Sequence, residues 1–269
     1  MLKPLNLSLN ELKYLLDEKA EQYNRPEFIE TDPIQIPRLF DYQQDAEIAG
    51  FITATISWGN RKSIINNAHK FLKIIGNSPY DFVMEYNQNW EKTTDKFVHR
   101  TFNGVDLAQF IYALQAMYTS CQTMEEAFLK HHLDGEDYLA AIDKFRNEFT
   151  RSFIDKRSLK HVSSPLAGSA AKRINMFLRW MVRKDNKGVD MGWWKNASPA
   201  LLSCPLDVHT GNVARELGLI QRKQNDRKAL EELDKVLRKF NSADPVLYDF
   251  ALFGIGIFEK MENFLKTEK

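Results

Sequence analysis

Two residues of this sequence, Lys172 and Asp207, combine reactive side chains with a local setting suited to chemistry. Lys172 follows a tight turn that begins at Leu166 and precedes apolar residues at helical spacing, and Asp207 stands at the head of the next strong helix. A deprotonated lysine amine is a nucleophile that forms Schiff bases, and a carboxylate stabilises positive charge in a transition state. Asp is also favoured as a helix N-cap, so a purely structural role for Asp207 stays open.

The elements that would position these two residues are helices. Apolar residues recur at helical spacing along nearly the whole chain, and the sustained period-two alternation that marks strands is scarce. Helices are predicted near residues 8–23, 45–58, 61–75, 106–119, 123–132, 136–152, 174–181, 207–217, 226–240 and 245–265. The proline-containing stretch 26–37 is predicted to be an extended connection, and 184–192 a polar loop. The sequence therefore predicts an all-α protein.

Charge is unevenly distributed along a chain of 269 residues whose net charge is only +1. Residues 1–150 sum to −7, residues 151–240 to +10 and residues 241–269 to −2. The basic stretch contains both Lys172 and Asp207, so the near-neutral total does not exclude a polyanionic partner. Solvated Lys and Arg side chains on helix faces would give the same excess, and charge alone leaves both explanations open.

Composition excludes several other classes of protein. With 43% hydrophobic and 12% aromatic residues and no low-complexity tract, the chain can form a core and is not expected to be disordered. Two cysteines, Cys121 and Cys204, are too few for a disulfide framework or for a four-thiolate iron–sulfur or zinc site. The start lacks a signal-peptide core and no apolar stretch reaches the ~18 residues of a membrane span, so we expect a soluble cytoplasmic protein.

The turn before Lys172 and the segment around Asp207 match two motifs of a known superfamily. Leu166, Gly168 and Lys172 keep the register of a Leu-Pro-Gly-Val-Gly-x-Lys hairpin, and Asp207 and His209 keep an Asp-x-His segment at the head of a helix. These segments resemble the helix-hairpin-helix DNA glycosylase superfamily, the endonuclease III-like base-excision repair enzymes. The spacing of 35 residues between the lysine and the aspartate is similar to that of the archaeal 8-oxoguanine DNA glycosylases.

The resemblance implies removal of a damaged base, with an oxidised purine as one candidate, from double-stranded DNA. Lys172 would be the nucleophile and Asp207 its electrostatic partner. Cleavage of the DNA strand through a Schiff base on Lys172 would be a second step. It also implies two helical domains beside a DNA-binding cleft, residues 42–204 with the hairpin and residues 1–41 plus 205–269. We expect a monomer. We expect no cofactor or metal, because the iron–sulfur cysteines are absent and the possible metal ligands at residues 131–137 are bunched in one turn.

An enzyme that flips a base out of the duplex needs an aromatic pocket and a wedge. By resemblance, Trp193, Trp194 and Phe253 are the pocket candidates, and Trp58 and Asn60 are the wedge candidates. The candidates for DNA contacts are Leu166, Gly168, Ser169, Ala170, Arg173, Lys156, Arg157, Lys160 and His209. Ala170 departs from the motif, because it replaces the second hairpin glycine, which lets backbone amides approach a phosphate.

Two other functions fit the same sequence. One is a catalytically silent nucleic-acid-binding module of the same fold, and the other is a helical protein-interaction scaffold whose motif match is accidental. Geometry separates the three hypotheses. A glycosylase needs Lys172 and Asp207 to face one another across a cleft lined by basic and aromatic groups, whereas a silent binder would keep the basic cleft but lack a pocket for a base. A scaffold would show an exposed apolar patch instead.

Overall fold

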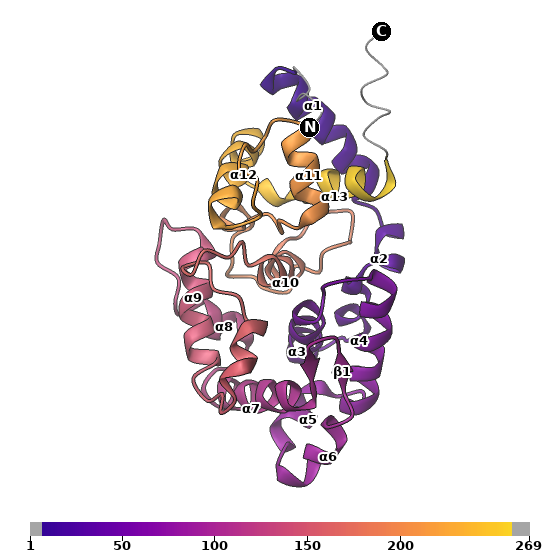
Figure 1. Cartoon of the computed structure of the whole chain (residues 1–269), viewed down its shortest axis with the longest axis vertical. Coiled ribbons are helices and arrows are strands. Elements are labelled where there is room, and N and C mark those ends of the chain that lie inside the picture. The colour runs from indigo at the N-terminus through magenta and orange to yellow at the C-terminus, as the bar shows by residue number, and fades with distance from the viewer. Residues whose placement is uncertain (1–6, 260–269) are drawn as a thin grey trace.

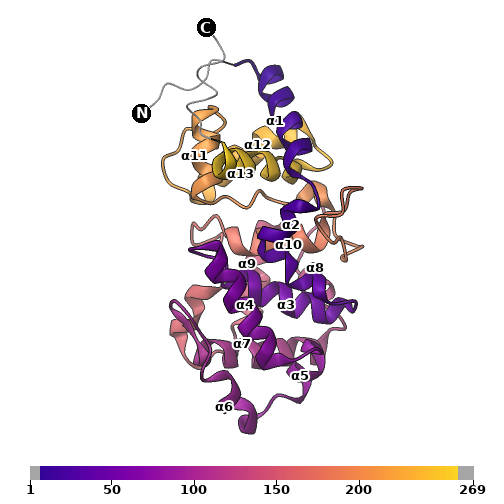
Figure 2. The ribbon, with the colours of Figure 1, turned by 90° about the vertical axis from the view of Figure 1, so that its right-hand side faces the viewer.

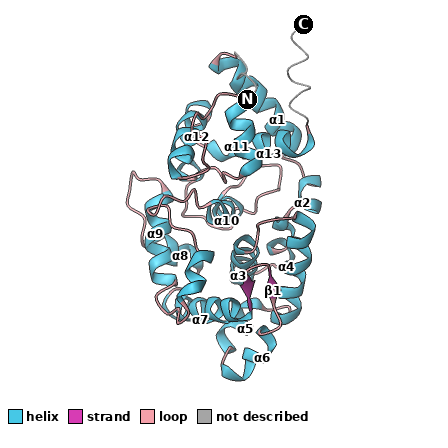
Figure 3. Cartoon of the chain, viewed as in Figure 1, coloured by secondary structure: helices cyan, strands magenta, loops and turns pink. Residues whose placement is uncertain are grey.

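A computed structural model of the chain describes residues 7–259, and helices account for most of them (Figure 3). Within this range the only strands form one short antiparallel hairpin, β1 (Val98–His99) paired with β2 (Phe102–Asn103). The prediction of an all-α protein is confirmed. No helix in residues 7–259 is long and apolar enough to span a bilayer.

Helices run along most of the described chain, and the longest stretch without an α-helix lies between Val182 and Val208. The α-helices are α1 (Leu9–Tyr23), α2 (Glu27–Thr31), α3 (Gln43–Thr55), α4 (Arg61–Ile75), α5 (Pro79–Glu85), α6 (Glu91–Thr94), α7 (Gly104–Ser120), α8 (Met124–Leu129), α9 (Tyr138–Phe149), α10 (Lys172–Val182), α11 (Val208–Glu216), α12 (Arg227–Phe240) and α13 (Tyr248–Phe258). The 3₁₀ helices are η1 (Pro33–Gln35), η2 (Pro37–Leu39), η3 (Gln88–Trp90), η4 (Lys156–His161), η5 (Pro199–Leu201) and η6 (Pro245–Leu247).

Helix α10 lies at the centre of the molecule, between a group formed by α1, α11, α12 and α13 and a larger group formed by α3 to α9 (Figures 1 and 2). Helix α13 packs against α1 and α11, so the two ends of the described chain meet in the first group. Helix α10 packs against α3 of the second group. The N-terminal segment is divided between the two groups, because α1 contacts α13 whereas η1 and η2 contact α3.

Several helix ends follow from their capping residues. Ser8 begins α1 with a capping box, in which its hydroxyl accepts the Glu11 N–H at 3.3 Å and the Glu11 carboxylate accepts the Ser8 N–H at 2.7 Å. Asn60 caps α4 by accepting the Ser63 N–H at 3.1 Å. As a result, α4 begins and ends where the sequence predicts.

The prediction of an extended connection over residues 26–37 is wrong. This stretch forms α2, η1 and the start of η2. Pro33 and Pro37 occupy the first positions of the two 3₁₀ helices, where the missing N–H of proline has no partner to lose. Asp32 stabilises the first of them by accepting the Ile34 N–H at 3.0 Å.

Beyond shifts of a few residues at helix ends, the differences from the predicted helices involve short elements and the C-terminal end of the chain. The last predicted helix begins as η6 and continues as α13 to Phe258, and its residues 260–265 lie outside the described range. Helices α5 and α6 and the β1–β2 hairpin were not predicted. Each is too short for its apolar period to be distinguished from chance.

The helix-hairpin-helix element implied by the resemblance is not confirmed. Helix α10 does follow the turn at Gly168, but the turn is preceded by the 3₁₀ helix η4 and by residues 162–167, which contain no helix. The turn is held by a hydrogen bond from the Gly168 N–H to the Pro165 carbonyl at 2.9 Å. A second bond joins the Arg227 N–H to the Gly168 carbonyl at 2.9 Å and ties the turn to the start of α12.

Candidate functional site

Lys172 and Asp207 line the same cavity, which has a volume of about 720 Å³. The first turns of α10 and α11, helix α13, the α2–η1 segment and the loop between α3 and α4 form its wall. Aromatic rings from Phe28, Trp58 and Phe253 share this wall with several basic side chains. The lysine and the aspartate therefore share one cavity with basic and aromatic groups, which is part of what the glycosylase hypothesis requires.

Lys172 is the first residue of α10, and a strained backbone places it there. The preceding residue, Ala171, adopts φ 45° and ψ 39°, a left-handed conformation that only glycine takes up easily. The Ser169 hydroxyl supports this turn by accepting the Ala171 N–H at 3.0 Å. The Lys172 amine lies 3.2 Å from the Met176 sulfur, and no carboxylate of residues 7–259 lies within ion-pair distance of it.

Asp207 is the N-cap of α11. Its Oδ1 accepts the Thr210 N–H at 3.0 Å, and its backbone carbonyl accepts a hydrogen bond from the Asn225 side chain at 2.7 Å. Asn225 is itself held by the Arg215 guanidinium at 2.5 Å. No group in the described part of the chain donates a hydrogen bond to Oδ2 of Asp207. The capping role therefore uses one carboxylate oxygen and leaves the other available to a ligand.

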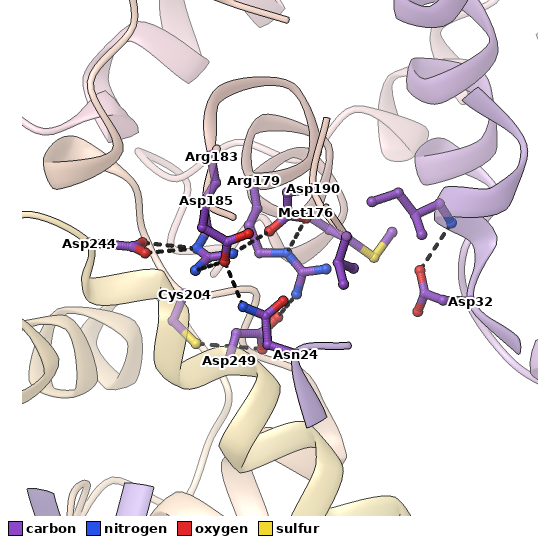
Figure 4. Close-up of polar contacts among 12 residues, drawn as sticks. Asn24, Asp32, Met176, Arg179, Arg183, Asp185, Asp190, Cys204, Asp244 and Asp249 are labelled. Atoms are coloured by element: carbon purple, nitrogen blue, oxygen red, sulfur yellow. Dashed lines mark hydrogen bonds and ion pairs between the residues drawn. The ribbon is translucent and has the colours of Figure 1, made fainter. Parts of the chain in front are cut away.

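A buried ion pair borders the cavity beside these two residues. Arg179 and Asp249 both line it, both are at most 4% exposed, and Arg179 Nη1 donates to Asp249 Oδ2 (Figure 4). Burial raises the pKa of Asp249 to about 6; the charges of Arg179 and Lys172 oppose this rise and that of Asp207 adds to it. The charges of Lys172 and Asp207 therefore both influence the pKa of the buried Asp249 carboxyl.

Arg179 belongs to a larger ion-pair network that connects α10 with its surroundings (Figure 4). Its Nε lies 3.2 Å from Asp190, which also accepts from Arg183 at 3.1 Å. Arg183 continues to Asp244 at 2.9 Å and to Asp185 at 2.7 Å. The network fixes the helix that carries Lys172 against α13 and the segment before η6.

Trp58 forms the aromatic wall contributed by the loop between α3 and α4. The Arg173 guanidinium carbon lies 5.0 Å from its ring centre, the His99 ring meets it edge-on at 4.9 Å, and the His161 ring lies 5.9 Å away. These neighbours restrict the ring to one orientation. Asn60 lines the cavity two residues later, where its side-chain oxygen is engaged as the cap of α4.

Phe253 and His209 line the cavity from α13 and α11. Their rings meet edge-on with centres 6.4 Å apart, and His209 is exposed. The Arg61 guanidinium carbon lies 4.8 Å above the Phe253 ring. Lys172, Asp207, Trp58, Asn60, Phe253, Arg173 and His209, all predicted from the sequence, are thus brought to one cavity.

Trp193 and Trp194 do not line the cavity. Trp194 is 2% exposed, and its indole N–H donates to the buried Glu47 carboxylate at 2.7 Å while its ring packs against Phe128 and Phe177. Trp193 packs against the same core. The prediction that this pair forms the base pocket therefore has no support in the geometry, because a satisfied indole N–H in a packed core makes Trp194 a structural residue.

Three of the predicted DNA contacts are buried or already engaged by other groups of the protein. Ala170 is only 4% exposed, so it cannot present its backbone to a phosphate. Arg157 forms an ion pair with Asp106 at 2.8 Å. Arg173 donates to the Thr55 carbonyl at the end of α3 at 2.5 Å, and burial lowers its pKa to about 10. Leu166, Gly168, Lys156 and Lys160 are exposed and Ser169 is half-buried, so these remain accessible to a partner.

Several residues of the cavity could not be placed there from the sequence, chiefly Arg61, Asp249, Asp32 and Asn225, and Arg179 was a candidate only as one of the basic groups available for phosphate contact. Arg61 directly follows the predicted wedge residue Asn60, which was the available signal. Arg179 follows Lys172 by two helical turns and therefore shares its face of α10. Asn225 lies in a loop with no periodic pattern, and nothing in the sequence marks it.

The histidines and acids of residues 131–137 do not converge. His131 lies 2.7 Å from Glu148, the His132 ring contacts Tyr138, and Asp137 caps α9 by accepting the Leu139 N–H. Among the described residues no group of three or more His, Cys, Asp or Glu side chains could hold a metal ion.

Asp234 positions the segment that leads to Asp207 by accepting the Cys204 N–H at 3.0 Å. Burial raises the pKa of Asp234 to about 6, against the opposing charge of Arg238. The folded protein therefore binds this proton more tightly than the unfolded chain, in which the pKa of Asp is ~3.9. The contribution of Asp234 to the free energy of unfolding accordingly increases as the pH falls from about 7 to about 4.

We expect Asp234→Asn to remove this pH dependence while keeping an acceptor for the Cys204 N–H. Urea unfolding of both proteins between about pH 7 and pH 4 measures the effect. The free energy of unfolding of the wild type minus that of the variant should increase over this range. A constant difference would show that the carboxyl titrates alike in the folded and unfolded states.

Comparison with known proteins identifies the chain by family only. No curated protein and no solved structure matches it significantly. The model of DUF2400, a family of proteins of unknown function, matches residues 32–258. This range includes Lys172 and Asp207 and covers most of the chain. The chain therefore belongs to the DUF2400 family.

Proposed function

We propose that this protein is a DNA glycosylase that excises a damaged base from double-stranded DNA. The observation that supports the proposal most strongly is the shared cavity of Lys172 and Asp207. They lie 35 residues apart in the sequence, at the starts of two different helices, and the resemblance to the helix-hairpin-helix glycosylases had already paired them. A monomer that acts in the cytoplasm is part of the same proposal.

The proposed reaction begins with attack of the neutral Lys172 amine on C1′ of the damaged nucleotide. A C1′–N bond to the lysine forms as the glycosidic bond breaks, its electron pair leaves with the base, and the base takes up the proton that the amine loses. Positive charge develops at C1′ in the transition state, and the Asp207 carboxylate stabilises it. Opening of the sugar ring then gives a Schiff base on Lys172, from which elimination of the 3′ phosphate would cleave the strand.

The cavity suits a base that has left the duplex. Its volume of about 720 Å³ lies within the ~300–1,000 Å³ of typical small-molecule pockets. Trp58 and Phe253 line this cavity with aromatic rings, and a flipped base that stacks on them would meet the Arg173 and Arg61 guanidinium groups that lie over these rings. The buried Arg179–Asp249 pair supplies a donor and an acceptor at the wall. An oxidised purine is the first lesion to test. Cleavage of the DNA strand is measured separately from release of the base.

The experiment measures base release from short duplexes that carry a panel of damaged bases, with Asp207→Asn beside the wild type. Asn is as good an N-cap as Asp, so we expect the thermal stability of the variant to stay within a few degrees of the wild type. Loss of the negative charge should slow base release by about 10²-fold, the usual effect of removing one preorganised electrostatic group.

Three outcomes decide between the hypotheses. Release by the wild type that slows in Asp207→Asn supports the glycosylase. Tight duplex binding without release of any base would replace it with a silent binding module. Failure to bind any duplex would favour a protein-interaction scaffold.

A further inference from the structure

Three basic side chains without acidic partners surround the loop that carries Trp58, Gly59 and Asn60. Arg61 and Lys62 are the first two residues of α4, and Arg100 lies at the tip of the β1–β2 hairpin. None of the three forms an ion pair with any acidic group in residues 7–259. We call Arg61, Lys62 and Arg100 the rim cluster. Arg61 lines the cavity together with Gly59 and Asn60, Lys62 follows Arg61 in the sequence, and Arg100 contacts Gly59.

Arg100 is held against this loop by its backbone. It occupies the first position of the two-residue turn between His99 and Phe102 with φ 56°, where glycine is the residue normally found. A Cβ atom placed on Gly59 would lie only 2.6 Å from Arg100 Nη1, so the guanidinium rests directly on the Gly59 backbone. Arg100 and Ala171 are the two non-glycine residues with positive φ in the described chain, and both adjoin the cavity.

The β1–β2 hairpin and the loop form one packed unit. The His99 ring meets Trp58 edge-on, and His99 Nε2 lies 3.4 Å from the Trp58 carbonyl oxygen. The Asn67 side chain from α4 contacts the other ring nitrogen, Nδ1, at 3.0 Å. Arg100 is therefore presented at a fixed place relative to the aromatic wall of the cavity.

The rim cluster is unfavourable in the protein alone. Cations in the first turn of a helix are opposed by the positive end of its dipole, and α4 has no acidic residue there to compensate Arg61 and Lys62. Positive φ at a residue with a side chain is strained, and such strain collects at functional positions. Arg61 contacts the Phe253 ring and Thr31, but no carboxylate in the described part of the chain neutralises any of the three cations. Together with the strained backbone at Arg100, this indicates that an anion completes the surface.

We propose that the rim cluster binds the phosphate backbone of the DNA whose damaged base enters the cavity. This inference rests on the proposed function and adds a second basic surface to the exposed Lys156 and Lys160. Arg is suited to phosphate because its planar guanidinium can donate two parallel hydrogen bonds. Contacts of this kind hold the protein in register on the duplex and carry no sequence information.

Arg100→Gly tests the proposal without threatening the fold. Glycine adopts the positive φ of this turn without strain, so we expect the melting temperature of the variant to equal or exceed that of the wild type. The probe is a short duplex with one tetrahydrofuran abasic analogue, bound between about 50 and 200 mM salt. Loss of one phosphate contact should reduce the slope of log K against log salt by about one. Arg100→Lys, which keeps the positive charge, should recover part of the lost salt slope.

Lys92→Ala is the matched control, because Lys92 is exposed on α6, far from α10 in both views of the fold (Figures 1 and 2). It should bind with the wild-type salt slope. If Arg100→Gly binds the duplex with unchanged affinity and slope, the rim cluster inference is overturned and the glycosylase proposal is unaffected. If the wild type does not bind the duplex even at the lowest salt concentration, the glycosylase proposal is overturned, and with it the rim cluster inference that rests on it.

Discussion

Replacement of Lys172 by Gln is expected to abolish borohydride trapping of the protein on damaged duplex DNA and to slow base release by at least about 10³-fold. Borohydride reduces a Schiff base, which requires a primary amine bonded to C1′, and Gln has none. Lys172 is the only lysine that lines the cavity among the described residues. Gln keeps a polar side chain of similar length with good helix propensity, so α10 should form normally.

Lys235→Gln provides the comparison for this result. Lys235 is exposed on α12 and does not line the cavity, so this variant loses the same charge without touching the site. It should form the trapped adduct as efficiently as the wild type. A trapped adduct that persists in Lys172→Gln on the same duplexes would remove Lys172 from the mechanism, even if base release by the wild type is established.

The helices could be predicted where a long apolar period coincides with a capping signal. Ser8 with Glu11 begins α1, and Asn60 begins α4, as their residue types indicate. The same reasoning failed over 26–37, because the prolines there were interpreted as breaks although they can begin 3₁₀ helices. The β1–β2 hairpin could not be predicted, because two-residue hairpin turns are recognised by a glycine and this turn has Arg100 at that position.

The site could be predicted only to the extent that its chemistry is local. Lys172 and Asp207 each stand at the start of a helix, which a sequence reveals. The burial of Trp194 against Glu47 depends on a contact between residues 147 apart, which no local pattern encodes. Summed charge does not locate unpaired cations either. Arg157, Arg179 and Arg183 of the basic stretch pair with Asp106, Asp249 and Asp244, which lie outside it, whereas the rim cluster lies in the acidic half.

Loss of Arg183 from the buried network beside the cavity should destabilise the protein strongly. Arg183 is 1% exposed and contacts Asp190, Asp244 and Asp185, and Asp190 is buried as well. Arg183→Met fills a similar volume but leaves Asp190 with Arg179 as its only cationic partner. Removing one partner of a buried ion pair costs about 3–5 kcal/mol, because the remaining charge is desolvated without compensation. We expect the melting temperature to fall by about 10 °C.

Lys187→Met separates the effect of burial from the loss of a charge. Lys187 lies in the same connection after α10 and pairs with Glu21, but both side chains are partly exposed to solvent. An exposed pair contributes at most about 1 kcal/mol, so this variant should unfold within about 2–4 °C of the wild type. Equal losses in the two variants would mean that the network owes its strength to surface charge and not to burial. A much larger loss in Arg183→Met would identify the network as the buried connection that holds α10, and with it Lys172, against α13 and the segment before η6.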